Sequence, residues 1–225
     1  LNNPDYIYEP AEAHKRIKFM QTMCLQSKHP YFGKPVDLMP WQLAFTEALY
    51  SFKMANTGLR RFVEALLEIG RKNGKSTFLA ADGNTDLFIG EGGSEICCAS
   101  NDDKQCRYIW REIAGMRQRL DPKNSITKQN LSEIRNNVKN IIISRMSSKT
   151  QNKDGGNYTK TYQDESHDVD EENGNCEIAE ACWRGMSTKD DPIFINCTTQ
   201  GFSRDGCYLD KKVARAKQVI DGEID

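Results

Sequence analysis

The sequence predicts an α/β fold, with a mainly parallel sheet and helices on both of its faces. Two observations lead to this prediction. From residue 62 onward, short apolar runs of strand length alternate with longer segments whose apolar residues recur every three or four positions. This alternation is typical of right-handed crossovers between parallel strands. The 225 residues are also 38% hydrophobic and 28% charged, which suits one globular domain with a sizeable core.

The first 60 residues predict a helical N-terminal part. Residues 11–27 carry apolar side chains at helical spacing, and residues 41–52 repeat that pattern. Between them, "HPYFGKPVDLMP" contains three prolines and a glycine and therefore predicts a loop. We expect this part, residues 1–60, to precede a core of residues 61–225 within a single domain.

The core is expected to begin with two strand–helix units. Residues 62–69 and 94–100 are short apolar runs and predict strands. Residues 75–88 follow a glycine and are rich in alanine, so they predict a helix. Residues 102–120 predict a second helix, because the apolar residues in their second half recur every three or four positions.

The second half of the core continues the alternation. Residues 140–146 contain three consecutive isoleucines and predict a strand, whereas residues 158–164 predict a strand with a weaker composition. A helix at 174–186, a strand at 192–198 and a closing helix at 206–220 complete the pattern. In a parallel sheet of this kind, ligands bind at the carboxyl ends of the strands, so the loops there are the places to look for a site.

Charge and cysteine content restrict the function classes. The net charge is -1, so any contact with a polyanion must come from a local basic face. Eight cysteines are present without a C-x-x-C pair and with only three histidines, which argues against a structural zinc site and favours small buried thiols in a reducing compartment. No apolar run reaches the length of a membrane span, and we expect no signal peptide.

A candidate phosphate-binding loop follows the first core strand. The common pattern is G-x-x-x-x-G-K-[ST] between a strand and a helix, but here Ile69 stands where the first glycine is expected and Gly70 follows one place late. Gly70 and Gly74 permit backbone dihedrals that turn several N–H groups toward a phosphate, next to the positive end of a helix. Lys75 would reach the β- and γ-phosphates of ATP, and the Ser76 hydroxyl would ligate Mg²⁺. The candidate ATP-binding residues here are Gly70, Arg71, Lys72, Asn73, Gly74, Lys75, Ser76 and Thr77.

Arg71 has two open interpretations. A guanidinium inside a phosphate loop could stabilise charge on the γ-phosphate in the transition state, as an arginine finger does. It could equally be an outward surface arginine, or one that pairs with a carboxylate and holds the loop. The residue types alone do not separate these roles.

An acidic pair after the strand at 158–164 supplies the second half of a nucleotide site. In an ATPase the first carboxylate, here Asp164, binds Mg²⁺, and the second, here Glu165, polarises the attacking water. We expect two neighbouring parallel strands to bring this pair and the Lys75–Ser76 corner around one triphosphate. His167 completes the D-E-x-H order of helicase-like ATPases, although a polar surface histidine is the simpler interpretation.

Three further residues are weaker candidates. Gln42 lies upstream of the loop, and its amide could donate to and accept from an adenine edge, or could simply start a helix. Thr198 and Thr199 end the strand at 192–198 and could sense the γ-phosphate state, or could form an ordinary turn. Cations cluster after the second strand and could face a DNA backbone, although a solvated helix face is the simpler interpretation. They are Arg107, Arg111, Arg117, Arg119, Lys123 and Lys128.

These segments together resemble a known family. "MPWQ", "GRKNGKS", "YQDESHD" and "INCTTQG", in this order and spacing, are similar to the ATPase domain of tailed-bacteriophage terminase large subunits, over about residues 10–220. The resemblance implies a P-loop NTPase fold of the RecA/ASCE type. It also implies that Arg71 acts as an arginine trigger, that Asp164 and Glu165 form the acidic pair, and that Gln42 lies on the adenine side. The family's coupling motif maps onto Thr198 and Thr199, although "CTTQG" departs from its usual serine- and alanine-containing form.

The family likeness also implies partners and a setting. It implies a DNA-packaging motor in the host bacterial cytoplasm that hydrolyses Mg·ATP and translocates double-stranded DNA into a procapsid. Its partners would be the portal protein, the terminase small subunit and further copies of itself in a ring, with no membrane. Family members usually continue into a nuclease domain. No later carboxylate cluster is present here, so we expect the ATPase domain without nuclease activity.

Two other functions remain open from the sequence. A helicase-like ATPase would share the D-E-x-H order, but it would need a second motor domain that this sequence does not contain. A nucleotide-binding assembly module would bind ATP without hydrolysing it. The combination of Lys75, Ser76, Asp164 and Glu165 argues against that second alternative.

Overall fold

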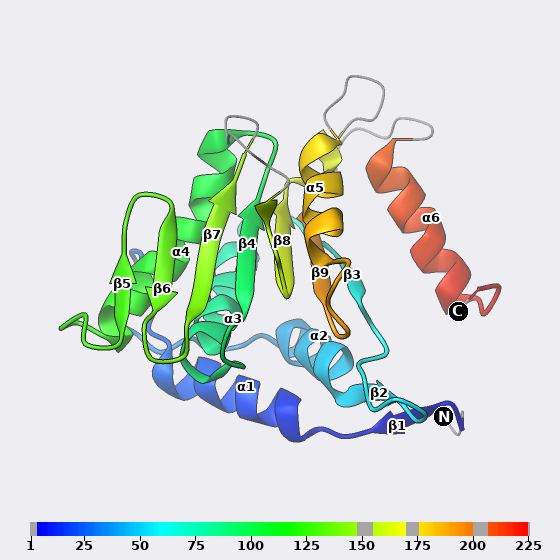
Figure 1. Cartoon of the computed structure of the whole chain (residues 1–225), viewed down its shortest axis with the longest axis horizontal. Coiled ribbons are helices and arrows are strands. Elements are labelled where there is room, and N and C mark those ends of the chain that lie inside the picture. Colours follow the sequence, from blue (N-terminus) through cyan, green and yellow to red (C-terminus); the bar gives the residue numbers. More distant parts are fainter. Residues whose placement is uncertain (1–3, 148–154, 170–175, 200–206, 225) are drawn as a thin grey trace.

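The computed structural model describes residues 4–147, 155–169, 176–199 and 207–224 (Figure 1). The helices are α1 (Ala11–Met23), α2 (Pro40–Ser51), α3 (Lys75–Ile89), α4 (Asp103–Leu120), α5 (Glu177–Met186) and α6 (Tyr208–Ile220). The strands are β1 (Tyr6–Tyr8), β2 (Phe52–Met54), β3 (Glu64–Glu68), β4 (Glu95–Ala99), β5 (Thr127–Gln129), β6 (Glu133–Asn136), β7 (Ile141–Met146), β8 (Lys160–Asp164) and β9 (Ile193–Thr198). The starts at 174 and 206 that the sequence predicts for the last two helices fall outside the described residues.

A seven-stranded sheet organises the core, in the order β3-β9-β8-β4-β7-β6-β5. The first five strands in this order are parallel, and β6 and β5 continue the sheet antiparallel. The predicted α/β fold with a mainly parallel sheet is therefore confirmed. One detail is wrong: β9 lies between β3 and β8, so the two strands that carry the candidate motifs are not neighbours. Their carboxyl ends still lie at the same edge of the sheet.

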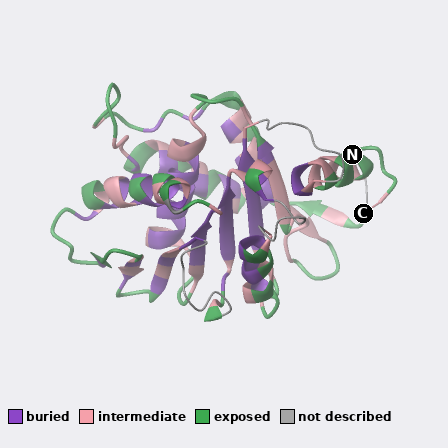
Figure 2. Ribbon diagram, turned by 90° about the horizontal axis from the view of Figure 1, so that it is seen from above, coloured by how far each residue is buried: buried purple, intermediate pink, exposed green. Residues whose placement is uncertain are grey.

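The sheet lies between two apolar cores, and successive side chains of its central strands enter one core and then the other. On β4, Ile96 and Cys98 belong to the larger core under α3 and α4, whereas Cys97 and Ala99 belong to the smaller core under α5. Successive side chains of a strand point to opposite faces, so a central strand that is buried on both faces reads as a continuous apolar run. In Figure 2 the buried residues accordingly follow the central strands, and exposed residues lie at the periphery.

The N-terminal part is helical, as expected, but it also contains a small sheet. β1 and β2 pair antiparallel, with Tyr8 opposite Phe52. Figure 1 shows α1 across the amino-terminal end of the parallel strands, with α2 beside it. Within the described residues, every helix is too short or too polar to cross a lipid bilayer.

The antiparallel extension β5–β6 was not predicted. Its strands are only three and four residues long. The turn before β5 is held by Asp121, whose carboxylate accepts hydrogen bonds from the N–H groups of Ser125 (2.8 Å), Ile126 (3.0 Å) and Thr127 (2.7 Å). Asn136 at the end of β6 donates to the carbonyl of Leu87 (2.8 Å) and so fixes the extension to α3.

A buried network of charges joins the N-terminal part to the core. Asp82 on α3 accepts hydrogen bonds from Arg16 (2.8 Å), Lys160 (3.0 Å) and the Tyr162 hydroxyl (2.7 Å). Asp86, one turn further along α3, also pairs with both Arg16 and Lys160. Because buried charges are costly unless paired, these contacts fix α1 and the start of β8 against the helix that follows the candidate phosphate loop.

Candidate nucleotide site

The loop between β3 and α3 has the backbone conformation that a phosphate cradle needs. Gly74, the residue before α3, has φ 78°, and Lys72 has φ 66°, so both lie in the left-handed region. The Asn73 side chain donates to the carbonyl of Gly70 (3.1 Å) and closes the loop on itself. A loop of this form turns successive N–H groups toward one side, next to the positive end of a helix. Such a loop can therefore bind an anion.

Gln42 lies directly against this loop. Its side-chain nitrogen is 3.2 Å from the point that a Cβ at Gly74 would occupy. The amide oxygen of Gln42 is already used, because it accepts a hydrogen bond from the Met39 N–H (2.9 Å) at the start of α2. The donor half of the amide is the part beside the loop, where it could reach a ligand. The side chain caps α2 and contacts the loop at the same time.

The two halves of the candidate site meet at Lys75. Its ammonium nitrogen is 2.9 Å from Oδ1 of Asp164 and 3.6 Å from Oε1 of Glu165. Asp164 is the last residue of β8 and is only 3% exposed. The carboxyl ends of β3 and β8 thus bring the basic loop and the acidic pair together across β9, although the two segments lie 89 residues apart in the sequence.

Burial and pairing oppose each other at this contact. Burial raises the pKa of Asp164 above its usual value, although the Lys75 ammonium acts in the opposite direction. Burial alone would lower the pKa of Lys75, but Cys197 and Asp164 outweigh it and the pKa is raised. The Lys75 side chain is therefore charged at neutral pH, and a further cation near Asp164 would favour its carboxylate form.

The donor set at this corner fits Mg²⁺. Among the described residues there is no group of three or more His, Cys, Asp or Glu side chains that could enclose a metal. Mg²⁺ in phosphate-binding sites is held through only one or two protein oxygens, and phosphate and water supply the rest. Ser76, partly buried at the start of α3, and the buried carboxylate of Asp164 could supply these protein oxygens.

Glu165 has a strained backbone that points its side chain into the site. Its dihedrals of φ 52° and ψ 54° lie in the left-handed region, which costs a residue with a side chain about 1–2 kcal/mol. Its Oε2 is buried and makes no hydrogen bond with the described residues, although it lies 3.2 Å from Nδ1 of His167. This approach is electrostatic, because Nδ1 of His167 lies closer to the Thr198 hydroxyl oxygen (2.7 Å). The oxygen is therefore able to accept a proton.

Thr198 connects the acidic pair to the phosphate loop. The residue is fully buried at the end of β9, and its Oγ1 is 2.7 Å from His167 Nδ1. Its carbonyl accepts a hydrogen bond from the Ile69 N–H (3.0 Å), directly before Gly70. The side chain of Thr198 donates to the carbonyl of the candidate coupling residue Thr199 (2.7 Å).

The remaining loop residues are placed more openly. Arg71 and Lys72 are exposed, and Arg71 makes no ion pair with a described residue. Thr77 lies in the first turn of α3 and is partly buried. The position of Arg71 leaves its guanidinium able to approach a bound ligand, and it is not consumed in holding the loop.

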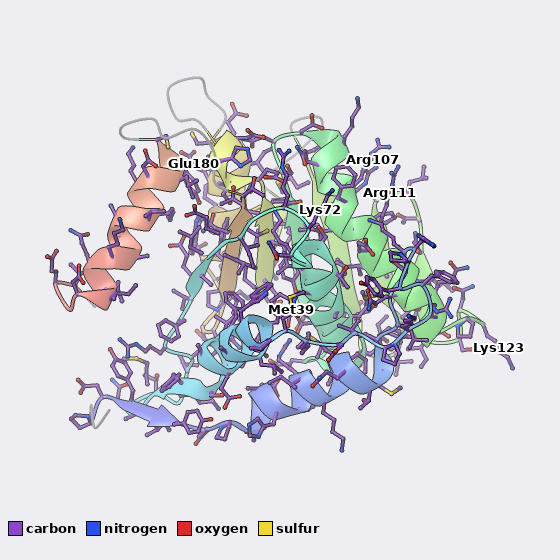
Figure 3. All side chains as sticks on the ribbon, turned by 180° about the vertical axis from the view of Figure 1, so that it is seen from behind. Met39, Lys72, Arg107, Arg111, Lys123 and Glu180 are labelled. Atoms are coloured by element: carbon purple, nitrogen blue, oxygen red, sulfur yellow. The ribbon has the colours of Figure 1, made fainter. Side chains whose placement is uncertain are left out.

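The basic region after β4 divides into structural and exposed residues. Arg117 is buried, and it donates to Asn124 (2.7 Å) and Thr127 (3.0 Å) in the turn before β5. Arg119 stacks over the ring of Phe32 at 4.5 Å. Figure 3 shows Arg107 and Arg111 on neighbouring turns of α4, with Lys123 beyond the far end of that helix. The exposed cations there are Arg111, Arg119, Lys123 and Lys128.

Two residues near the site were not assigned a role from the sequence. His167 contacts both Glu165 and Thr198, whereas its sequence pattern favours a polar surface histidine. Cys197 lies beneath the acidic pair, with its Sγ 3.7 Å from Oδ1 of Asp164. For His167 the D-E-x-H spacing was an available signal, but no local pattern marks Cys197.

Comparisons with known proteins show the family and the fold of the chain. The family model described as "Terminase large subunit, ATPase domain" matches residues 40–217. The large terminase of HK97 bacteriophage is similar in structure, with a TM-score of 0.75 and 22% identity over 93% of this chain and 42% of that protein. The large terminase ATPase domain of a Thermus phage has a TM-score of 0.56 and 18% identity over 80% of this chain and 72% of its own. A comparison with curated proteins gives no match. The chain thus spans well under half of the HK97 protein.

Proposed function

Because the chain belongs to the family of terminase large subunit ATPase domains, we propose that it hydrolyses Mg·ATP to ADP and phosphate and couples the reaction to the translocation of double-stranded DNA. The observation that carries the proposal is the contact of Lys75 with both Asp164 and Glu165, at 2.9 and 3.6 Å. It supports the proposal because a cation suited to phosphate, a carboxylate suited to Mg²⁺ and a second carboxylate suited to act as a base lie close together.

Each residue has a role that its position supports. The backbone N–H groups of residues 70–76 and the Lys75 ammonium bind the β- and γ-phosphates. Ser76 and Asp164 hold Mg²⁺, which, when bound, neutralises charge on the phosphates. Glu165 accepts the proton of the attacking water at its buried Oε2. Arg71 stabilises charge on the γ-phosphate from its exposed position on the loop.

Coupling and DNA binding rest on other parts of the structure. Thr198 and Thr199 follow the state of the γ-phosphate, because Thr198 is hydrogen-bonded to the residue before the phosphate loop. The exposed cations Arg111, on α4, and Lys123, beyond the far end of that helix, suit contact with a DNA backbone. The portal protein, the terminase small subunit and a ring of further copies are the partners of this motor, and it works in the host cytoplasm.

The proposal is tested by ATP turnover in three matched variants. We expect Glu165→Gln to bind ATP with nearly unchanged affinity and to lose about 100-fold or more in phosphate release, because the general base is removed. Lys75→Ala should lose ATP binding as well. Glu91→Gln is the matched control, since Glu91 is exposed just beyond the far end of α3.

The possible outcomes separate the functions. Unchanged turnover in both Lys75→Ala and Glu165→Gln would remove the mechanism. Tight ATP binding without any phosphate release by the unaltered chain, even with duplex DNA present, would favour a non-hydrolysing assembly module instead.

A further inference from the structure

We propose that His167 is a positioning residue: its Nδ1–H is bonded to Thr198 at the end of β9, and the ring held in this way orients the Glu165 carboxylate electrostatically. The inference rests on the proposed function, because it assigns a residue to the same site. It also goes beyond that function, which needs only the acidic pair, the phosphate loop and the end of β9.

The tautomer of His167 follows from the Thr198 hydroxyl. That hydroxyl has one proton, and it donates it to the carbonyl of Thr199 (2.7 Å). Toward His167, Oγ1 must therefore act as an acceptor. It accepts from the backbone N–H of His167 (3.3 Å) and lies 2.7 Å from Nδ1. Nδ1 consequently carries a proton and points it at Thr198.

The same ring nitrogen faces the free oxygen of Glu165. Oε2 lies 3.2 Å from Nδ1, while Oε1 lies 3.6 Å from Lys75 Nζ. The carboxylate is thus placed between two positively polarised nitrogens from different elements. On the other side of the ring, Nε2 is 3.2 Å from Asp168, which is half exposed. The Nδ1 side is therefore the one directed into the site.

Backbone strain explains why such a support is needed. Glu165 lies in the left-handed region, and residues with side chains persist there only when their surroundings hold them. The N–H of Glu165 donates to Asp164 Oδ1 (3.1 Å), but this contact fixes the backbone and not the carboxylate. His167, in the turn after β8, lies beside the side chain and links it to Thr198 at the end of β9. Through Thr198 and Ile69, it joins the proposed general base to the phosphate loop.

Two substitutions of similar polarity distinguish the two ring nitrogens. Asparagine places its amide nitrogen near the position of Nδ1, whereas glutamine places it near Nε2. In ATP turnover by the whole chain, we expect His167→Ala and His167→Gln to lower kcat about 10-fold or more, with KM for ATP changed by less than about two-fold. We expect His167→Asn to stay within about three-fold of the unaltered chain.

Thr198 provides the second arm of the experiment. Thr198→Val removes the hydroxyl and should lower kcat as His167→Ala does, whereas Thr198→Ser should not. The double variant His167→Ala/Thr198→Val should be no slower than the slower single variant, because both remove the same link. Asp168→Asn changes only the Nε2 side and should leave turnover within about two-fold.

The result that overturns the inference differs from the one that overturns the proposed function. If Glu165→Gln abolishes turnover but His167→Ala keeps the kcat of the unaltered chain, His167 has no positioning role. Equal losses in His167→Asn and His167→Ala would contradict the Nδ1 assignment in the same way. If Glu165→Gln itself retains turnover, the proposed function fails first. Thermal unfolding of each variant shows whether a loss of kcat reflects a loss of folded protein.

Discussion

The buried charge network makes a strong prediction for Lys160→Met. The Lys160 ammonium is 2.7 Å from the Tyr50 hydroxyl and 3.0 Å from Asp82, and it also pairs with Asp86. When the Lys160 ammonium is removed, Arg16 is left to pair with both buried carboxylates, Asp82 and Asp86. Methionine fills a similar volume, so the loss is mainly electrostatic.

The expected cost is large relative to the stability of a domain. Breaking a buried ion pair by removing one partner costs about 3–5 kcal/mol, because it leaves an uncompensated charge. Total stabilities are about 5–15 kcal/mol. In a domain of this size, such a loss lowers the midpoint of thermal unfolding by about 6–20 °C.

Urea unfolding at pH 7, followed by circular dichroism, measures this cost. The matched control is Lys53→Met, because Lys53 makes a more exposed ion pair with Glu9 (3.0 Å) that is worth less than about 1 kcal/mol. The double variant Lys160→Met/Asp86→Leu restores a balance of one cation to one anion and should recover part of the loss. A cost below about 1 kcal/mol for Lys160→Met, or a double variant less stable than the sum of its single changes, would refute the reasoning.

Two further predictions concern acid stability and nucleotide binding. Burial alone would raise the pKa of Asp82, but Lys160 and Arg16 outweigh it and lower that pKa from 3.8 to about 2. A folded-state pKa below the unfolded one stabilises the protein above about pH 4. About 2 kcal/mol should therefore be lost as the pH falls through about 2, and Asp82→Asn should flatten this dependence in acid unfolding curves. Gln42→Glu keeps the acceptor for the Met39 N–H but removes the donor beside Gly74, so we expect the Kd for ATP to rise about 3–10-fold with an unchanged Tm. A parallel fall in Tm would instead assign Gln42 to capping alone.

The sequence predicts those parts of the fold whose pattern lies within one short segment of the chain. Strands such as β4 and β7 are buried on both faces, so their apolar runs are nearly continuous and easily recognised. The phosphate loop was also recognisable, because its glycines, Lys75 and Ser76 are contiguous. In contrast, β5 and β6 are too short to show a period.

The parts that were missed depend on contacts between distant residues. The order of the sheet, with β9 between β3 and β8, is not contained in any local pattern. The buried network joins Arg16, Asp82 and Lys160, which lie far apart in the sequence. A weak signal was present, since Asp82 and Asp86 lie one turn apart and are, with Lys75, the only charged residues of α3. The role of His167 required the Thr198 hydroxyl beside it, which the spacing alone could not supply.

The central position of β9 limits how this domain can move. Residues of β9 pair with β3 on one side and with β8 on the other, from Phe194 to Cys197. Sliding β9 along its own axis would break its backbone hydrogen bonds to both β3 and β8. The register of β9 relative to the two strands that carry the candidate motifs is therefore fixed. A displacement of β9 would therefore have to carry β3 and β8 with it.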